Sequence, residues 1–126
     1  MFNKEKIGGY VIRFHSIYYL ILGIWATFFI ESFGRITMHG HEGLDFKMHI
    51  IAGAMFIILG LYYLYSIRNK NWLKTNGDII YLILGISLAM VIVELIYLPQ
   101  KGLNLFWMDL IEETFIILSL LWILKK

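Results

Sequence analysis

Four long runs without acidic or basic charge dominate this sequence. Asp, Glu, Lys and Arg are absent from residues 14–30, 48–67, 79–93 and 114–124. An apolar stretch of about 17–25 residues can cross the hydrocarbon core of a bilayer as a helix, once tilt and snorkelling ends are allowed for. The chain is 60% hydrophobic, above the roughly 45–50% of ordinary soluble domains. We therefore predict an all-α, four-helix transmembrane bundle. It would form a single integral-membrane domain, residues 1–126, with spans at 13–34, 47–68, 78–98 and 105–124.

Several other classes of protein fit the composition poorly. A soluble helical protein needs polar faces on its helices, and Ile50 to Leu64 offers almost none. The first apolar run is too long for a signal peptide, and no small-residue cleavage site follows it. The absence of cysteine excludes disulfides and thiolate metal sites. The net charge of +2 is too small and too dispersed to predict nucleic-acid binding.

Basic residues are distributed unevenly between the predicted loops. Eight fall on the side that holds both termini and the loop between the second and third spans: Lys4, Lys6, Arg13, Arg68, Lys70, Lys74, Lys125 and Lys126. The other side has Arg35, Lys47 and Lys101. Because short loops rich in Lys and Arg stay in the cytoplasm, we expect an up-down topology with both termini cytoplasmic. The protein would be a multi-pass component of the inner or plasma membrane.

Aromatic residues agree with this orientation, since Trp and Tyr collect at membrane interfaces. We expect an inner belt of Tyr62, Tyr63, Tyr65, Trp72, Tyr81 and Trp122, and an outer belt of Tyr97, Phe106 and Trp107.

Ionisable side chains occur inside the predicted spans, mainly in their outer halves. Glu113 precedes Lys125 by 12 residues, or about 18 Å of helix. In a hydrocarbon core about 30 Å thick, Glu113 would lie on the order of 10 Å below the outer surface. His15 is expected near the inner face. The same count places three other groups toward the outer side: Glu31, His49 and Glu94.

Small residues share helical faces with two of these groups. One face of the first helix contains Ser16, Leu20, Gly23, Thr27 and Glu31, and one face of the second contains His49, Gly53, Phe56 and Gly60. Small residues favour close helix contact in membranes, and charged groups in spans face the interior of the protein. We therefore expect the ionisable side chains to converge. Gly23, Gly53, Gly60 and Gly85 are expected to be packing points.

The convergence predicts a polar pocket that opens to the outer side. Imidazole and carboxylate ligands suit zinc, manganese, iron, nickel or copper, while membrane carboxylates also suit proton-coupled transport. We expect binding or transport of a cation, either a proton or a divalent metal, at Glu31, His49, Glu94 and Glu113. The expected outer shell contains Arg35, His39, His41, Glu42, Asp45, Asp109 and Glu112. For Asp109 the favoured interpretation is an acid that stabilises a helix N-terminus. The Glu-x-x-His pair of di-metal helical bundles is absent.

Alternative functions remain open at this point. The chain can be a non-catalytic accessory subunit whose acids pair with basic residues of a partner, or a receptor-like pocket for a lipophilic amine. No phosphate-binding loop and no Gly-x-Ser-x-Gly context occurs, so the sequence favours a protein that is not an enzyme. Beyond the lipid bilayer, the expected partners are further copies of the chain or another membrane subunit.

Two resemblances to known families are limited in extent. The size and span number are similar to those of small multidrug transporters, which work as dimers around a mid-depth glutamate of the first span. Glu31 lies near the end of its span, so no residue is carried over. "RFHSIYYLILGIW" (13–25) and "KMHIIAGAMFIILG" (47–60) resemble helices of membrane b-type cytochromes. About 25 Å of depth separates His15 from His49, which one haem cannot bridge, so haem is not the expected cofactor.

Overall fold

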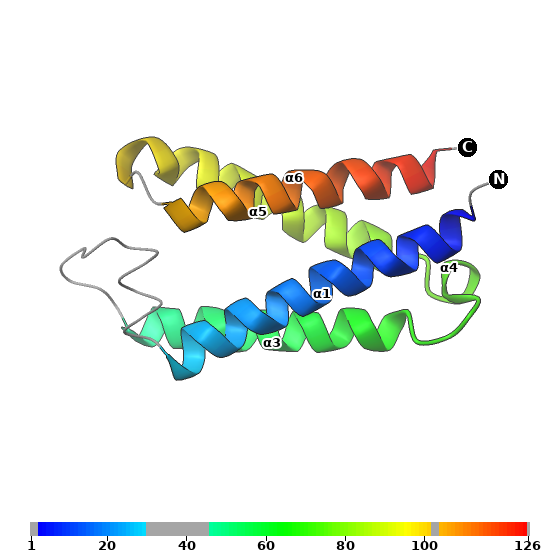
Figure 1. Ribbon diagram of the computed structural model, residues 1–126, viewed down its shortest axis with the longest axis horizontal. Helices are drawn as coiled ribbons and strands as arrows, with labels where there is room; N and C mark the ends of the chain where they lie inside the picture. The colour runs from blue at the N-terminus through cyan, green and yellow to red at the C-terminus, as the bar shows by residue number, and fades with distance from the viewer. Residues whose placement is uncertain (1–2, 30–45, 102–103, 126) are drawn as a thin grey trace.

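The regular structure of this chain is helical throughout the part that is described. The computed structural model describes residues 3–29, 46–101 and 104–125, without the side chains of 46–49, 97–101 and 104–106. Within these ranges the elements are α1 (Lys4–Phe28), α3 (Phe46–Ser66), the single-turn α4 (Trp72–Thr75), α5 (Ile79–Lys101) and α6 (Asn104–Leu124) (Figure 1). The prediction of an all-α fold is confirmed.

The four long helices form two pairs. Helix α1 packs along α3, α5 packs along α6, and the pairs meet through the contact between α1 and α6 (Figure 1). Both termini lie at the same end of the molecule, where the Lys4 ammonium donates a hydrogen bond to the backbone carbonyl of Lys125. Depths along α1 and α6 can therefore be counted from a shared end.

Helix α1 begins nine residues before the start expected for the first span at residue 13. Asn3 caps it, because its side chain accepts hydrogen bonds from the backbone N–H groups of Glu5 (3.0 Å) and Lys6 (3.3 Å). The acidic side chain of Glu5 in the first turn also complements the helix dipole. The polar segment that we interpreted as a cytoplasmic loop is thus the first two turns of α1.

Helix α5 begins where the third predicted span begins, but it ends later than that span. At its start, the N–H of Ile80 is bonded to the carbonyl of Gly77 (3.1 Å) and that of Tyr81 to the carbonyl of Asp78 (3.1 Å). At its other end α5 continues through Pro99 to Lys101, three residues beyond the expected end of the span at residue 98. A proline removes one helical hydrogen bond, a loss that the last turn of a long helix tolerates.

Glycines allow α1 and α3 to approach each other closely. A Cβ atom added to Gly23 would lie 2.6 Å from the carbonyl oxygen of Gly53, and one added to Gly60 would lie 2.8 Å from that of Ser16. One added to Gly53 would collide with the Thr27 hydroxyl. The expected small-residue contact is therefore present. Gly85 was expected to be a packing point as well, but it is exposed and nothing lies within 4 Å of such an atom.

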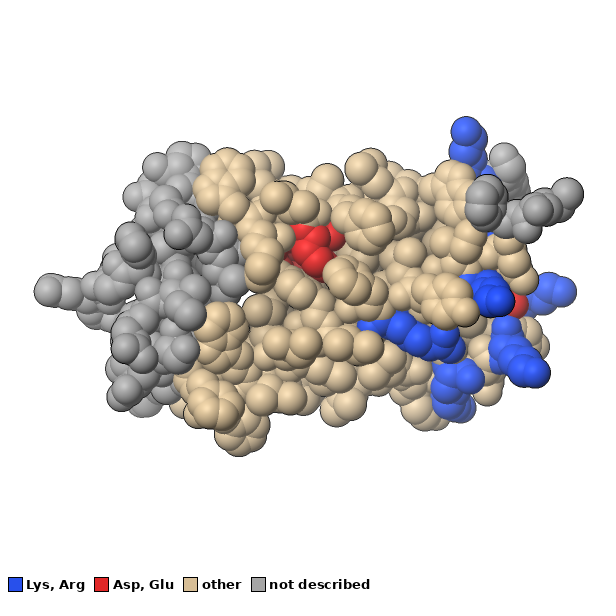
Figure 2. Space-filling view, viewed as in Figure 1, with Lys and Arg blue, Asp and Glu red and all other residues tan. Residues whose placement is uncertain are grey.

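The distribution of polarity is inverted relative to that of a water-soluble protein. The buried residues include eight polar or charged ones: His15, Ser16, Ser66, Ser87, Glu94, Asp109, Glu112 and Glu113. Large apolar side chains such as Ile21, Ile58 and Ile111 are 60%, 64% and 69% exposed. Figure 2 shows this apolar surface, with acidic atoms visible midway along the molecule and a few more among the Lys and Arg side chains at the end that holds the termini. An apolar core of Ile12, Ile80, Ile83, Ile116 and Leu120 lies nearer the termini.

Within the described residues, two helices are long and apolar enough to cross a membrane, Lys4–Phe28 and Ile79–Ile96. The described part of α3, Ile50–Ser66, is apolar but shorter, and α6 carries three acids. Four spans therefore remain a prediction.

Charged and aromatic groups near the termini follow the expected pattern in part. The described Lys and Arg side chains lie toward this end (Figure 2). Tyr62, Tyr65, Tyr81 and Trp122 are exposed there, as an interfacial belt requires. Tyr63 and Trp72, which were expected in the same belt, are instead 0% and 3% exposed.

Candidate metal centre

Three ionisable side chains meet between α1 and α6, about midway along the molecule. The Nδ1 atom of His15 lies 2.8 Å from Oε2 of Glu112, and its Nε2 atom lies 3.7 Å from Oε1 of Glu113. His15 and Glu113 are fully buried and Glu112 is 8% exposed. One potential ligand atom from each residue lies within 4.8 Å of the other two. We refer to His15, Glu112 and Glu113 as the triad.

The early start of α1 explains why His15 reaches the acids of α6. His15 follows Lys4 by 11 residues and Glu113 precedes Lys125 by 12, which corresponds to about 17 and 18 Å of helix. Since Lys4 and Lys125 are in contact, the imidazole and the carboxylate lie at the same level. His15 was expected near the inner face, whereas it lies at the same level as Glu113, which was expected in the outer half of its span.

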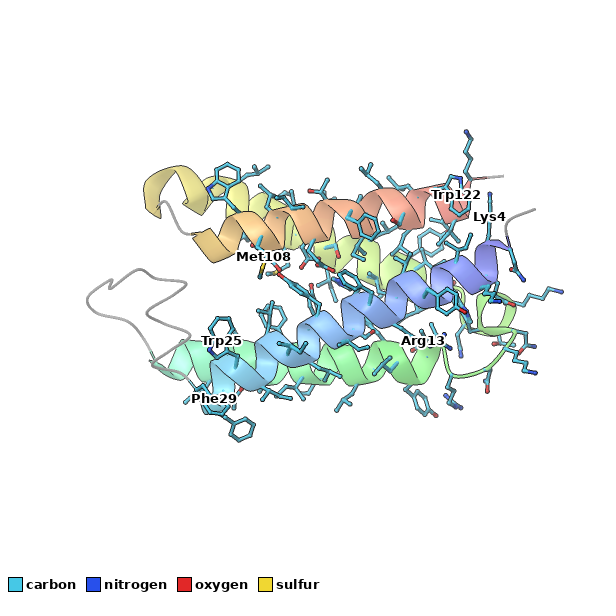
Figure 3. The ribbon with its side chains drawn as sticks, viewed as in Figure 1. Lys4, Arg13, Trp25, Phe29, Met108 and Trp122 are labelled. Carbon is cyan, nitrogen blue, oxygen red and sulfur yellow. The ribbon has the colours of Figure 1, made fainter. Side chains whose placement is uncertain are left out.

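Tyrosines surround the triad and hold two of the acids. The hydroxyl of Tyr19 donates a 2.8 Å hydrogen bond to Oε2 of Glu113, and the hydroxyl of Tyr18 donates a 2.6 Å hydrogen bond to Oδ1 of Asp109. The ring of Tyr63 stacks on that of His15 at 5.9 Å between centroids, with 16° between planes. These contacts fix the imidazole and the Glu113 carboxylate in place. Figure 3 shows side chains that project into the space between the α1–α3 pair and the α5–α6 pair, near the labelled Met108.

A second pair of acids lies beside the triad. Glu94 of α5 and Asp109 of α6 are 3% and 5% exposed, and their carboxyl groups interact with each other. Four carboxyl groups are thus gathered around one imidazole. Among the described residues, the ion pairs of these acids are formed with His15, and no Lys or Arg side chain contacts them. Buried carboxyl groups without basic partners are stabilised either by protonation or by a bound cation.

Several atoms of the cluster are buried without a hydrogen-bond partner among the described residues. They include Nε2 of His15, Oε1 of Glu112, Oε1 of Glu113 and Oε1 of Glu94. Leaving such a group unsatisfied costs about 1–3 kcal/mol, and more when it is charged. Nε2 of His15 and Oε1 of Glu113 can both donate an electron pair to one metal ion, so a cation bound between them would remove the cost of leaving these two atoms unsatisfied.

The geometry of the imidazole fits a metal ligand. A charged Glu112 accepts a hydrogen bond from Nδ1, which places the proton on that nitrogen and leaves the lone pair on Nε2. Metal-bound histidines are commonly oriented by a carboxylate in this way. Two ligands of a tetrahedral ion, each about 2.0–2.2 Å from it, lie roughly 3.3–3.6 Å apart. The 3.7 Å between Nε2 and Oε1 of Glu113 is only slightly longer.

The structure brings together part of the predicted site. Glu94 and Glu113 from the predicted ligands, and Asp109 and Glu112 from the predicted outer shell, lie in one buried cluster. Asp109 is therefore more than an exposed acid at a helix end. Six other candidates lie outside the described residues: Glu31, Arg35, His39, His41, Glu42 and Asp45. His49 belongs to α3, but its side chain lies outside the described part.

Sequence reasoning missed His15, although a usable signal was present. His15, Ser16 and Tyr19 are polar residues on one face of α1, and this face is buried against the rest of the molecule. The potential ligand set supported by the described residues is thus the triad, with Glu94 and Asp109 adjacent.

No protein family, no curated protein and no solved structure matches this chain. The candidate site is therefore interpreted from its own geometry.

Proposed function

We propose that this chain is a small multi-pass membrane protein that binds a divalent metal ion at the triad. His15 through Nε2 and Glu113 through Oε1 would be direct ligands, and Glu112 would orient the imidazole. The observation that carries the proposal is that these two buried, unpartnered atoms face each other at 3.7 Å. The clustering supports binding of an ion and is no evidence of its transport.

The proposed membrane location is supported by the inverted polarity of the molecule. Exposed Ile, Leu and Phe side chains cover the long helices, while the described charged residues are buried or lie toward the end that holds the termini. In lipid, ionisable groups face the interior of the protein and mark functional sites. Four spans with cytoplasmic termini remain the arrangement that best accounts for the apolar runs and the distribution of basic residues.

The donor set indicates which metals fit. One imidazole and one or two carboxylates suit zinc, manganese or ferrous iron, because these ions accept mixed nitrogen and oxygen ligands. Calcium prefers six to eight oxygen ligands, and the cluster offers a nitrogen. Two or three protein ligands leave coordination positions for water or for an incoming ligand.

Burial disfavours two alternative functions of the acids. An accessory subunit would pair them with a partner's basic side chains, and a receptor would pair them with a lipophilic amine. Both need the acids to be reachable from outside, but Glu113 is 0% exposed and Glu94 is 3% exposed. A small ion needs far less space than either of these partners.

Metal content measured on purified protein tests the proposal. Wild-type protein dialysed against zinc or manganese, then against buffer, should retain about one ion per chain. Glu113→Gln keeps the size of the side chain but removes its charge. It should weaken binding by at least about 100-fold, beyond the 10–100-fold typical of residues outside the ligand shell. The matched control is Asp78→Asn, which removes an exposed acid at the other end of α5. Wild-type protein without metal, or equal metal in Glu113→Gln, would contradict the proposal.

A further inference from the structure

A second polar site lies at the end of the molecule that holds the termini. A pocket of about 460 Å³ opens between the start of α1 and the segment that connects α3 to α5. Its lining includes Asn3, Lys6, Arg13, Asn69, Lys70 and Trp72. Arg13 and Lys4 are labelled in Figure 3 and show the stretch of α1 that forms one wall. The pocket is separate from the triad, which lies farther along α1.

The pocket carries an excess of positive charge. Lys6, Arg13 and Lys70 are exposed, and their side chains make no ion pair or hydrogen bond within the part of the chain that is described. Glu5 also lines the pocket, but its carboxylate accepts a 3.1 Å hydrogen bond from the backbone N–H of Leu73. Three cationic groups therefore face one acid that already has a partner.

A buried donor adds to these charges. Trp72 lines the pocket and is 3% exposed, and its indole N–H is a hydrogen-bond donor. Gly9 permits its close approach, since a Cβ atom there would lie 3.4 Å from Nε1 of Trp72 and 3.8 Å from Nη1 of Arg13. The indole and the guanidinium thus reach the same small area of α1, and both can donate to one acceptor.

We propose that this pocket binds a phosphate-type anion, with the headgroup of an anionic phospholipid as its source. Arg and Lys bind phosphate through charge-assisted hydrogen bonds, and basic pockets between helices on the cytoplasmic side accept anionic headgroups. The pocket is larger than a phosphate ion requires, which leaves space for a glycerol backbone. The lipid as source rests on the membrane location proposed above, whereas the binding of phosphate itself does not.

Retention of lipid by the purified protein tests this site. Protein reconstituted in nanodiscs of phosphatidylcholine with phosphatidylglycerol is released into mild detergent, and the lipids that remain bound are identified by native mass spectrometry. Wild-type protein should retain phosphatidylglycerol. The Arg13→Gln/Lys70→Gln double variant should retain much less, with about fivefold weaker binding for each charge removed. Lys74→Gln is the matched control, because Lys74 is exposed in the same segment but does not line the pocket.

Two further measurements identify the source of the bound phosphate group and test the Trp72 indole as its hydrogen-bond donor. Titration of lipid-free protein with inorganic phosphate, followed by tryptophan fluorescence, shows whether a free anion saturates the site. Saturation without lipid retention supports the pocket with a soluble phosphate as its ligand. Trp72→Phe keeps an aromatic ring but removes the N–H, so it should weaken binding of either ligand by about tenfold or more, as expected for one hydrogen bond to a charged group.

The result that would overturn the inference is an equal loss of lipid and phosphate in Lys74→Gln and the double variant, because general surface charge would then account for binding. Absence of both lipid and phosphate binding by the wild type would overturn it as well. Metal content should be unchanged in Arg13→Gln/Lys70→Gln, so failure of this site and failure of the metal site are distinguishable.

Discussion

Glu112 and Glu113 are adjacent in the chain yet meet different nitrogens of the same imidazole. Successive residues of a helix point about 100° apart, so the two carboxylates reach the ring of His15 from different sides. Glu112 is hydrogen-bonded to Nδ1 at 2.8 Å, whereas Glu113 faces Nε2 at 3.7 Å and is held by Tyr19. In the proposed metal site, this difference would give Glu112 the orienting role and Glu113 the role of a ligand.

The two substitutions should therefore differ in their effects. Glu112→Gln still offers an amide oxygen to the Nδ1–H group, so metal affinity should fall by about 10–100-fold, as for other groups that orient a ligand. Glu113→Gln should reduce it further. Isothermal titration of both variants with zinc checks the order. Equal losses would mean that Glu112 is also a direct ligand.

At the residue scale the sequence predicted the acids but not their partner. Glu94 and Glu113 were recognisable because charges interrupt apolar runs. His15 was misplaced because its depth was counted from Arg13, whereas α1 begins at Lys4. The capping side chain of Asn3 was the local signal for that earlier start.

The contact between α1 and α3 depends on the absence of side chains at three positions. A Cβ atom added to one of these glycines would clash with atoms of the other helix, and the two helices would have to move apart to remove the clash. Overpacking of this kind costs about 1–3 kcal/mol. Because α1 also carries His15, the α1–α3 contact indirectly positions the triad.

Gly23→Ala and Gly85→Ala should consequently have opposite effects on stability. A methyl group at Gly23 would meet the carbonyl oxygen of Gly53 at 2.6 Å and the backbone nitrogen of Ile57 at 2.9 Å, so we expect destabilisation by about 1–3 kcal/mol. At Gly85 there is open space, and alanine should stabilise the helix by about 0.5–1 kcal/mol. Unfolding in mixed micelles, followed by circular dichroism, measures both. A stable Gly23→Ala protein would argue against the close contact.

At the scale of elements, helical periodicity predicted which small residues share a helix face. It did not predict which other helix packs against that face. The spacing of Gly23, Gly53 and Gly60 was sufficient because α1 and α3 both carry small residues. Gly85 has no such counterpart opposite it. The continuation of α5 past Pro99 was also unforeseen, since the sequence does not show that the last turn can accept a lost hydrogen bond.

The whole molecule presents apolar side chains outward and ionisable groups inward, with basic residues toward the end that holds the termini (Figure 2). The apolar runs predicted the helices, and their even number predicted that both termini share an end. The contact between α1 and α6 was not predictable, because hydrophobic pattern alone does not specify which pairs of apolar helices adjoin.

Cysteine labelling tests the predicted orientation, because the chain contains no cysteine and any introduced thiol is unique. In intact cells, a membrane-impermeant maleimide should label Gly40→Cys, in the loop that the sequence places outside. It should leave Lys74→Cys unlabelled until the cells are broken. Labelling of Lys74→Cys in intact cells would contradict cytoplasmic termini.

The most direct measurement of the central claim is pulsed electron paramagnetic resonance of the protein loaded with Cu²⁺ as a probe for the metal site. Imidazole coordination gives a characteristic nitrogen modulation of the echo. We expect this modulation in the wild type and in His49→Gln, and its loss in His15→Gln. Loss in His49→Gln with retention in His15→Gln would show that the metal binds elsewhere and that the triad is not its site.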